Sequence, residues 1–386
     1  MSRGVTLLGL ALGAAVAAGA AAPAFALPTM VRLGYGNCAA CHVSPQGGGL
    51  LNAYGRAIDE AQSRRSAEYR PTNNRLVKLL SAGGRIQQDV RAVLVEQGSW
   101  TGDKSGVQLF RPRLMYRNVT ELGKGFRVSG TVTGESEFAP RPSLSYDRPA
   151  HPSEAFLNTA LVHYRPTRNL EFALGKDQLP TGVNIPDLGA YIKSHNRLGY
   201  YDSPVQLKMF LGHKRYQLVP FVYGPGGNEA SGERESGAGA LVEFDLLGTG
   251  KTVVGVSLAN GTAPNGDRRM VGAYTRLGFG RWGILVEHDV TDRTRDAPVA
   301  ASSFRQQASY AQLFVAVREW LVVSAIGERL TVEAPFAERV NAGKLELAAR
   351  LTNQASIGLS ARAQRNQLTG IWSRSLALQL ALKSPQ

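Results

Sequence analysis

The residues best suited to chemistry lie in one short stretch, Asn37-Cys38-Ala39-Ala40-Cys41-His42. Its two cysteines are the only ones in the 386 residues of the chain. A Cys-x-x-Cys-His pattern is the attachment site of a c-type haem. Each thiol can add to one vinyl group of the porphyrin, and the adjacent His42 can bind the iron as its proximal ligand. The stretch therefore predicts one covalent haem c, held by Cys38, Cys41 and His42.

Three other chemistries use paired cysteines: a disulfide, a thioredoxin-type redox pair and half of a zinc site. Structural zinc needs four ligands, and the sequence has no second cluster of Cys and His. A thioredoxin-type pair belongs in a βαβ unit, for which the sequence shows no pattern. We favour the haem, because the motif is complete and follows an export signal.

Residues 1–26 have the pattern of a secretory signal peptide. Arg3 provides the positive charge, an alanine-rich apolar run begins at Val5, and Ala24-Phe25-Ala26 is a cleavage site of the A-x-A kind. A transmembrane anchor is the alternative, but the small residues that end the run favour cleavage. Export fits the haem, because c-type haem is attached outside the cytoplasm.

The net charge narrows the range of partners. The chain carries 44 Lys and Arg against 30 Asp and Glu, a formal charge of +14. Basic chains often bind nucleic acid, but here the charges stand singly rather than in blocks, and the chain is exported. We therefore expect no nucleic-acid partner. Beyond the signal, no apolar run reaches the ~18 residues that predict a transmembrane helix.

Polar and apolar residues alternate along most of the chain from about residue 84 to residue 383. Residues 126–133, 344–351 and 372–382 show this period of two clearly, which predicts strands with one apolar face. We count about sixteen strands, with starts near residues 85, 107, 125, 154, 168, 205, 216, 236, 251, 268, 281, 304, 320, 339, 355 and 371.

The connections indicate what kind of sheet these strands form. Short turns alternate with longer links, whereas a soluble β-sandwich gives no reason for such alternation. Outer-membrane barrels have short periplasmic turns and long external loops. Trp282 and Trp320 lie at short turns, as in an interfacial aromatic girdle. We predict an all-β, transmembrane outer-membrane β-barrel of about 16 antiparallel strands over residues 82–386, with a porin-sized lumen. The longer links are placed near residues 98–106, 140–153, 179–204, 225–235, 261–267 and 292–303.

Residues 27–81 separate the signal from the barrel and form the predicted monohaem cytochrome c segment. The segment buries little surface by itself, but a covalent haem can organise it. We expect a helix around residues 56–70 and expect the segment to plug the lumen. By analogy with general porins, the link Leu179–Pro204 is expected to fold into the lumen and narrow it.

With these features the sequence resembles the fused monohaem cytochrome c–porin family, which includes outer-membrane cytochromes of iron-oxidising bacteria. The resemblance rests on Ala24-Phe25-Ala26, on the haem motif a dozen residues later, on the stretch that closes on Tyr54-Gly55-Arg56, and on the single barrel. In its order of signal peptide, haem segment and barrel, the resemblance extends over the whole chain. The resemblance implies electron transfer at the outer membrane, with ferrous iron as donor.

The sixth ligand of the haem iron is left open by the sequence. Residues 43–81 contain neither His nor Met. Our first choice is His195 in the inward link, with Met115 and Met30 as alternatives. The remaining candidates are His151, His163, His213 and Met270.

Arginines dominate the predicted inward face of the barrel. Arg111, Arg113 and Arg117 share one face of a strand with Met115, while Leu114 faces lipid. Three roles suit them: a solvated lumen wall, pairing with the haem propionates, or an anion-selective pore. We take Arg111 and Arg113 as the haem-binding pair.

These patterns predict an outer-membrane protein of a Gram-negative bacterium, surrounded by outer-membrane lipid. It would carry electrons between an extracellular donor or acceptor, Fe(II) among the candidates, and a periplasmic c-type cytochrome. The alternative is an anion or small-solute porin whose haem segment is structural. A haem peroxidase would need a distal acid–base pair, and the sequence shows no clear one.

Overall fold

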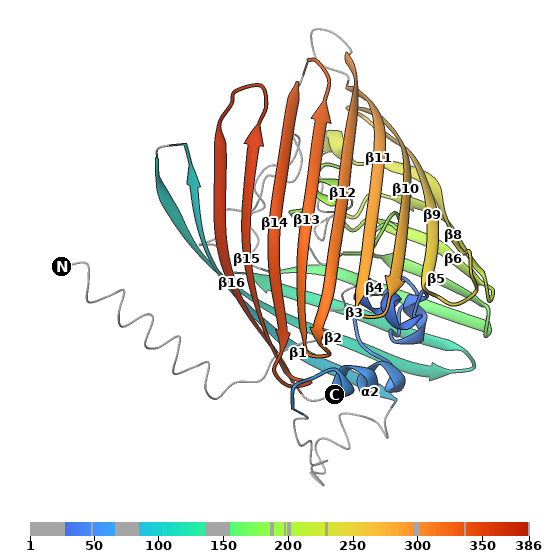
Figure 1. The fold of residues 1–386 in the computed structure, drawn as a ribbon. Helices are drawn as coiled ribbons and strands as arrows, with labels where there is room; N and C mark the ends of the chain where they lie inside the picture. Colours follow the sequence, from blue (N-terminus) through green and yellow to red (C-terminus); the bar gives the residue numbers. More distant parts are fainter. Residues whose placement is uncertain are drawn as a thin grey trace.

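A closed barrel of sixteen antiparallel strands dominates the computed structural model (Figure 1). The structure describes residues 28–47, 49–65, 85–102, 104–135, 155–185, 189–196, 198, 202–227, 231–295, 302–335 and 337–384. Each strand pairs with its neighbours in the chain, and β1 (Ile86–Thr101) closes the barrel against β16 (Trp372–Lys383). The predicted barrel and strand number are confirmed, and the predicted strand starts differ from the observed ones by at most three residues.

The strands cross the barrel wall in chain order. Their bounds are β1 Ile86–Thr101, β2 Lys104–Gly123, β3 Phe126–Glu135, β4 Ala155–Thr167, β5 Leu170–Lys176, β6 Val205–Gly212, β7 Tyr216–Gly224, β8 Ser236–Asp245, β9 Thr252–Ala263, β10 Gly266–Phe279, β11 Trp282–Arg295, β12 Ser302–Arg318, β13 Leu321–Val332, β14 Glu338–Arg350, β15 Ala355–Asn366 and β16 Trp372–Lys383.

Alternation along each strand separates an apolar exterior from the interior. In β2, the side chains of Phe110, Leu114 and Tyr116 are 53%, 56% and 42% exposed, while Met115 is only 8% exposed. The predicted phase of this strand is therefore confirmed. An exposed apolar exterior is the surface that a barrel presents to lipid.

Substituting Leu114 tests this assignment, because it lies at the middle of β2. We expect Leu114→Arg to lower the free energy of unfolding by about 2–4 kcal/mol, since the guanidinium must enter the hydrocarbon. Leu122→Arg, at the turn end of the same strand, is the matched control and should cost about 0–1 kcal/mol. Urea unfolding of the barrel in lipid vesicles measures both. Equal costs at the two positions would contradict the lipid-facing assignment.

The turns distinguish the two ends of the barrel. Seven short turns join β2 to β3, β4 to β5 and so on to β14 and β15, and we call this the short-turn end. Two of the predicted long links, 98–106 and 261–267, are wrong, because β1–β2 and β9–β10 continue into tight hairpins. Gly102 and Gly266 have φ angles of +58° and +134°, which allow these hairpins to reverse tightly.

The N-terminal segment, residues 28–65, contains the 3₁₀ turns η1 (Pro28–Leu33) and η2 (Cys38–Ala40) and the helix α2 (Ala53–Ala61). The predicted helix at 56–70 is wrong in its bounds. Asn52 begins the helix three residues earlier, because its side chain accepts a hydrogen bond from the Gly55 amide (2.8 Å). After α2 the chain turns away, and the amides of Arg64 and Arg65 bond to the backbone of residues 350 and 351.

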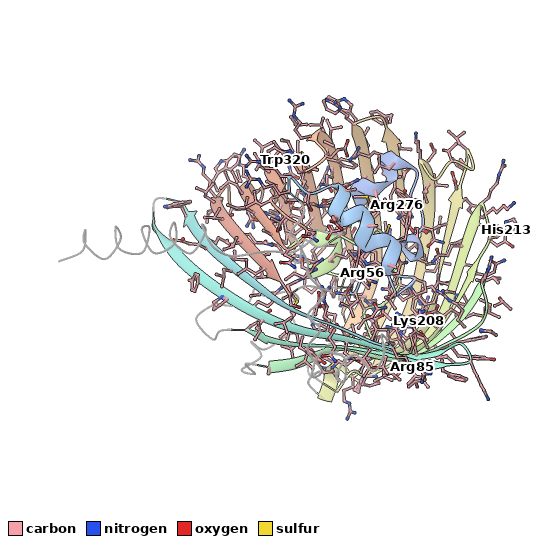
Figure 2. All side chains as sticks on the ribbon, turned by 90° about the horizontal axis from the view of Figure 1, so that it is seen from below. Arg56, Arg85, Lys208, His213, Arg276 and Trp320 are labelled. Carbon is pink, nitrogen blue, oxygen red and sulfur yellow. The ribbon has the colours of Figure 1, made fainter. Side chains whose placement is uncertain are left out.

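This segment lies across the short-turn end of the barrel (Figure 2). There η1 packs against β10 and β11, and Arg32 pairs with Glu319 at the β12–β13 turn (2.5 Å). At the other side, Asp59 of α2 pairs with Lys383 of β16 (3.2 Å). The segment thus touches walls on both sides of the opening. The predicted signal peptide, residues 1–26, lies outside the described residues.

The link between β5 and β6 enters the barrel, as predicted. It carries the short helix α4 (Tyr191–Ser194), which packs against β11, β12 and β13. Carboxylates of the inner wall bind its backbone: Glu287 accepts from the Val183 amide and Glu328 from the Tyr191 amide, both at 2.8 Å. Within the described residues, no helix is long and apolar enough to cross a membrane.

Candidate functional site

The Cys-x-x-Cys-His stretch forms a tight turn. The amides of Cys41 and His42 both bond to the carbonyl oxygen of Cys38, at 3.2 and 3.0 Å, and the Asn37 side chain accepts from the Ala39 amide (2.8 Å). Cys38 and Cys41 are half-buried and are not bonded to each other. The turn therefore brings both thiols and the imidazole together within five residues.

Residues 50–55 hold this turn in place. The Asn52 side chain donates to the carbonyl oxygens of Ala39 (3.3 Å) and Ala40 (3.1 Å). The backbone amide of Asn52 donates to the Cys41 carbonyl oxygen (2.9 Å). At Gly55, a Cβ atom would collide with the carbonyl oxygen of Cys41. Only glycine lets α2 approach so closely, which gives a physical reason for the Tyr54-Gly55-Arg56 stretch.

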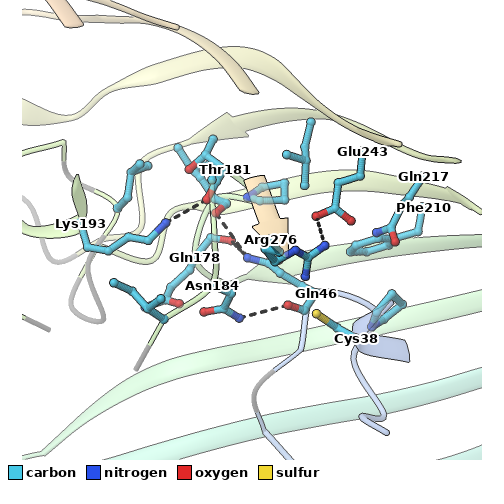
Figure 3. A pocket seen from close by; sticks show the side chains of 17 residues that line it. Cys38, Gln46, Gln178, Thr181, Asn184, Lys193, Phe210, Gln217, Glu243 and Arg276 are labelled. Carbon is cyan, nitrogen blue, oxygen red and sulfur yellow. Dashed lines mark hydrogen bonds and ion pairs between the residues drawn. The ribbon is translucent and has the colours of Figure 1, made fainter. Parts of the chain in front are cut away.

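The loop after the motif reaches the inward link. Asn184 donates to the Gln46 carbonyl oxygen (3.0 Å; Figure 3). Lys208 of β6 donates to the Gln46 side chain (2.6 Å). Gly47 has a φ of +83°, and a Cβ there would lie 3.1 Å from the Cys38 Sγ. The motif is therefore clamped between α2 and the inward link.

A cavity of about 990 Å³ lies in the lumen beside this turn. Cys38, Cys41 and His42 all line it, together with inward side chains of β1, β2 and β14–β16 and with α4. The volume is at the upper end of the range for ligand pockets. The barrel thus contains a ligand-sized space bordered by all three residues of the motif.

Part of the cavity wall is apolar, as a porphyrin face requires. Val93 and Met115 of the barrel are 9% and 8% exposed, Ala381 packs against them, and Leu50 and Leu51 of the N-terminal segment also line the cavity. A water-filled porin lumen is lined by polar residues. An apolar patch beside the motif therefore fits a bound haem better than it fits open water.

Charged side chains also line the cavity, nine Lys and Arg against three Asp and Glu. Arg113, one of the predicted haem-binding pair, lines it and pairs with Glu135 (2.5 Å). The side chain of Arg111, the other member, lies outside the described residues. Arg117 binds Asp89 and donates to the Gly49 carbonyl oxygen (2.6 Å), so it anchors the N-terminal segment.

Three of the candidates for the sixth iron ligand line the same cavity as His42. They are Met30, Met115 and His195. The other candidates do not line it: His163 bonds to Glu171 (2.9 Å) inside the wall, and Met270 is buried in a separate apolar cluster. His213 stacks on Tyr216 at a short turn, and His151 lies outside the described residues.

His195 follows α4 and lies at the inner end of the link. Its Nδ1 is 3.0 Å from the Ser194 hydroxyl, and its ring contacts Tyr191 edge-on at 5.4 Å between centroids. Its carbonyl oxygen accepts from Arg293 (3.0 Å). Burial, reinforced by the guanidiniums of Arg293 and Arg362, lowers the pKa of His195 to about 4. The imidazole is neutral at pH 7, the state in which it binds a metal.

Sequence reasoning missed the residues that support the motif. Asn52 could have been found, because an Asn before a helical pattern is a common N-cap. Arg276 could not, because β10 brings it to Cys38 from more than two hundred residues away in the chain. It donates to Glu243 of β8 (2.5 Å; Figure 3), and it also lines the cavity.

Comparison with known proteins identifies the fold. The chain is similar to the loop L8 deletion mutant of the outer-membrane protein OmpT of Vibrio cholerae, with a TM-score of 0.58, 10% identity, and coverage of 78% of this chain and 100% of the other. It is similar to OprB of Pseudomonas putida (TM-score 0.58, 8% identity, 80% and 96% covered) and to an anion-selective porin from Comamonas acidovorans (TM-score 0.56, 12% identity, 78% and 100% covered). No family model and no curated protein matches the chain. At these identities the likeness establishes the porin fold alone.

Proposed function

We propose that this protein is an outer-membrane electron-transfer protein with one covalent haem c in the lumen of its barrel. It exchanges electrons with an extracellular donor or acceptor and with a periplasmic c-type cytochrome. The observation that carries the proposal is the position of Cys38, Cys41 and His42 on one lumenal cavity with an apolar wall. The apolar exterior and the alternation of turns support location in the outer membrane of a Gram-negative bacterium.

Each part of the cavity has a role in this proposal. A bound haem supplies one-electron chemistry. Cys38 and Cys41 would hold it through thioethers, and His42 would bind its iron. Val93 and Met115 would exclude water from it, which would tune the redox potential. Arg113, which lines the cavity, would pair with the haem propionates, whereas Arg276 lies beside Cys38.

The external redox partner is less defined than the cofactor. Ferrous iron is what the family resemblance implies. The lumenal excess of cations does not favour a bound Fe²⁺ ion inside the barrel. Iron therefore reacts from the outside, or the partner is an anionic or neutral redox molecule.

A second function is an anion or small-solute channel with a structural N-terminal segment. The porin fold and the cation excess of the lumen favour it. Conductance in planar bilayers separates the two functions. The haem-loaded protein should conduct poorly if it is an electron carrier, because a haem in the cavity would close the space that residues 28–65 and the inward link leave open.

Stopped-flow mixing tests electron transfer itself. We expect rapid reduction or oxidation of the haem when the holoprotein is mixed with Fe(II), Fe(III) or a periplasmic cytochrome. The absorption of the haem measures this change of redox state. The double variant Cys38→Ala/Cys41→Ala is the control for absorption that does not come from the haem. If no partner changes the redox state rapidly, the proposed function is wrong.

A further inference from the structure

The short-turn end of the barrel carries a ring of exposed cations. Six of its seven turns have an exposed Lys or Arg at the turn or at its edge. We call these residues the cationic rim: Lys124, Arg168, Lys214, Lys251, Arg281 and Arg318.

Little negative charge offsets this rim. No member of it forms an ion pair with another residue in the described part of the chain. The exposed carboxylates described at this end are those of Glu60, Glu121 and Glu319, and Glu319 is already paired with Arg32. The short-turn end therefore presents a net positive surface to the solution.

Exposed apolar side chains lie across the opening that the rim surrounds. Leu33 is 39% exposed and Tyr54 is 49% exposed, and Ala53 and Ala57 are exposed on the outer face of α2. We call these four residues the mouth patch. The hydroxyl of Tyr54 bonds to that of Tyr35, and their rings meet edge-on at 5.9 Å between centroids. This contact orders the tyrosine at the surface.

The part of the mouth patch on α2 lies over the Cys-x-x-Cys-His turn. A Cβ atom at Gly55 would collide with the Cys41 carbonyl oxygen, and the backbone amide of Asn52 donates to the same oxygen. Ala53 and Ala57, on the exposed face of α2, have short side chains, so a partner can approach the helix backbone closely. A molecule seated on the patch is therefore separated from the turn by α2 alone.

We propose that the mouth patch and the cationic rim form the docking surface for a small periplasmic redox protein whose contact face is acidic. This inference rests on the proposed function and names the chemistry of its partner. Opposite charge on the partner steers it to the rim, and a small apolar centre lets the two surfaces touch near the haem turn. Weak electron-transfer complexes use small interfaces of this kind. One electron would pass between a haem iron bound by His42 and the redox centre of the partner, so that one would be oxidised as the other is reduced.

A bilayer surface is the competing occupant, because lipid phosphates also bind exposed cations. The position of the mouth patch favours a protein. Figure 2 shows residues 28–65 across the opening of the barrel, inside the ring of strands, whereas lipid surrounds the ring from outside. Lipid could contact the rim and Leu33, which lies beside the β8–β9 turn, but it could not cover the exposed face of α2 inside the ring of strands.

Two forms of one probe protein test the surface. Mitochondrial cytochrome c is basic, and succinylation converts its lysines into carboxylates without changing its haem. We expect the oxidised succinylated form to bind this protein, in zwitterionic nanodiscs, at least about tenfold more tightly than the native form at low salt. The difference should shrink as the salt concentration rises, because the Debye length falls from about 30 Å at 0.01 M to about 8 Å at 0.15 M.

Charge reversal locates the binding surface. The variant Lys124→Glu/Lys214→Glu/Lys251→Glu should lose the preference for the acidic probe. The matched control makes the same change in net charge at the opposite end of the barrel and should keep the preference. It carries Arg269→Glu, Arg339→Glu and Arg365→Glu, three exposed positions near the outer ends of β10, β14 and β15.

Three results would overturn the docking surface: equal binding of both probes, equal losses in the rim and control variants, or loss of acidic-probe binding when anionic lipid is added to the nanodiscs. The last result assigns the rim to lipid headgroups. A failure of the proposed electron transfer can be distinguished from a failure of the docking surface, because the probe can bind without any transfer of electrons. The haem content of the same preparation and haem oxidation by the neutral acceptor p-benzoquinone report on that function separately.

Discussion

Replacing both Cys38 and Cys41 with alanine is expected to abolish covalent haem while the barrel still folds. Both thioethers would come from this pair, because the chain has no other cysteine. The sixteen strands close through their own pairing, and neither cysteine belongs to a strand. Haem-dependent peroxidase staining of a denaturing gel measures the haem, and heat-modifiable migration measures the folded barrel.

The single variants provide the control for this prediction. Each retains one thiol, so we expect reduced but detectable covalent haem in Cys38→Ala and Cys41→Ala. The variant Asn52→Ala removes the side chain that bonds to Ala39 and Ala40, and it should lower the haem yield without removing either thiol. Undiminished staining in the double alanine variant would show that the pair does not attach haem.

The second large effect is expected at the sixth ligand of the haem iron. Among the three candidates that line the cavity we choose His195, because it lies on the inward link and is neutral at pH 7. His195→Ala should convert a low-spin haem to a high-spin haem and shift its reduction potential, within the range of about 0.8 V that axial ligands span. Optical spectra and redox titration of the purified holoprotein measure both changes.

Two further experiments show whether His195 is an iron ligand or only a structural residue: adding imidazole to the variant, and replacing the methionine candidates. Added imidazole should restore the low-spin spectrum of His195→Ala, since it can occupy the vacated position, whereas it would not repair a packing defect. Met115→Leu and Met30→Leu keep the volume of each side chain approximately and should leave the spectrum unchanged. A low-spin spectrum that survives in His195→Ala but is lost in Met115→Leu would assign the ligand to β2 instead.

The barrel could be predicted closely from the sequence because its main signal is local. Within each strand, the alternation of apolar and polar residues marks which side chains face lipid and which face the lumen. Strands that follow one another in the chain are also paired in the sheet. The two wrong links, 98–106 and 261–267, fall where strands end in hairpins. Near Gly102 and Gly266 the alternation fades, because glycine has no side chain to mark a face. The start of α2 was predicted three residues too late, because the prediction did not take Asn52 as the N-cap of the helix.

The candidate site was only partly predictable. Cys38, Cys41 and His42 are adjacent in sequence, so their chemistry could be inferred without a fold. The cavity is formed by residues that barrel closure brings together, such as Val93 of β1, Ala381 of β16 and Met115 of β2. No local pattern indicates that Arg276 would lie beside Cys38. Strand phase did predict that Met115 and Arg113 face the lumen, because phase is again a local property.

The haem content of the unaltered protein tests the central claim most directly. The protein would be extracted from isolated outer membranes, purified as a folded barrel, and analysed by intact mass and by its pyridine haemochrome spectrum. We predict one covalently bound haem per chain, attached at Cys38 and Cys41 and absent from the double alanine variant. A folded outer-membrane barrel without covalent haem, purified from cells that mature other c-type cytochromes, would contradict the account and leave the channel function.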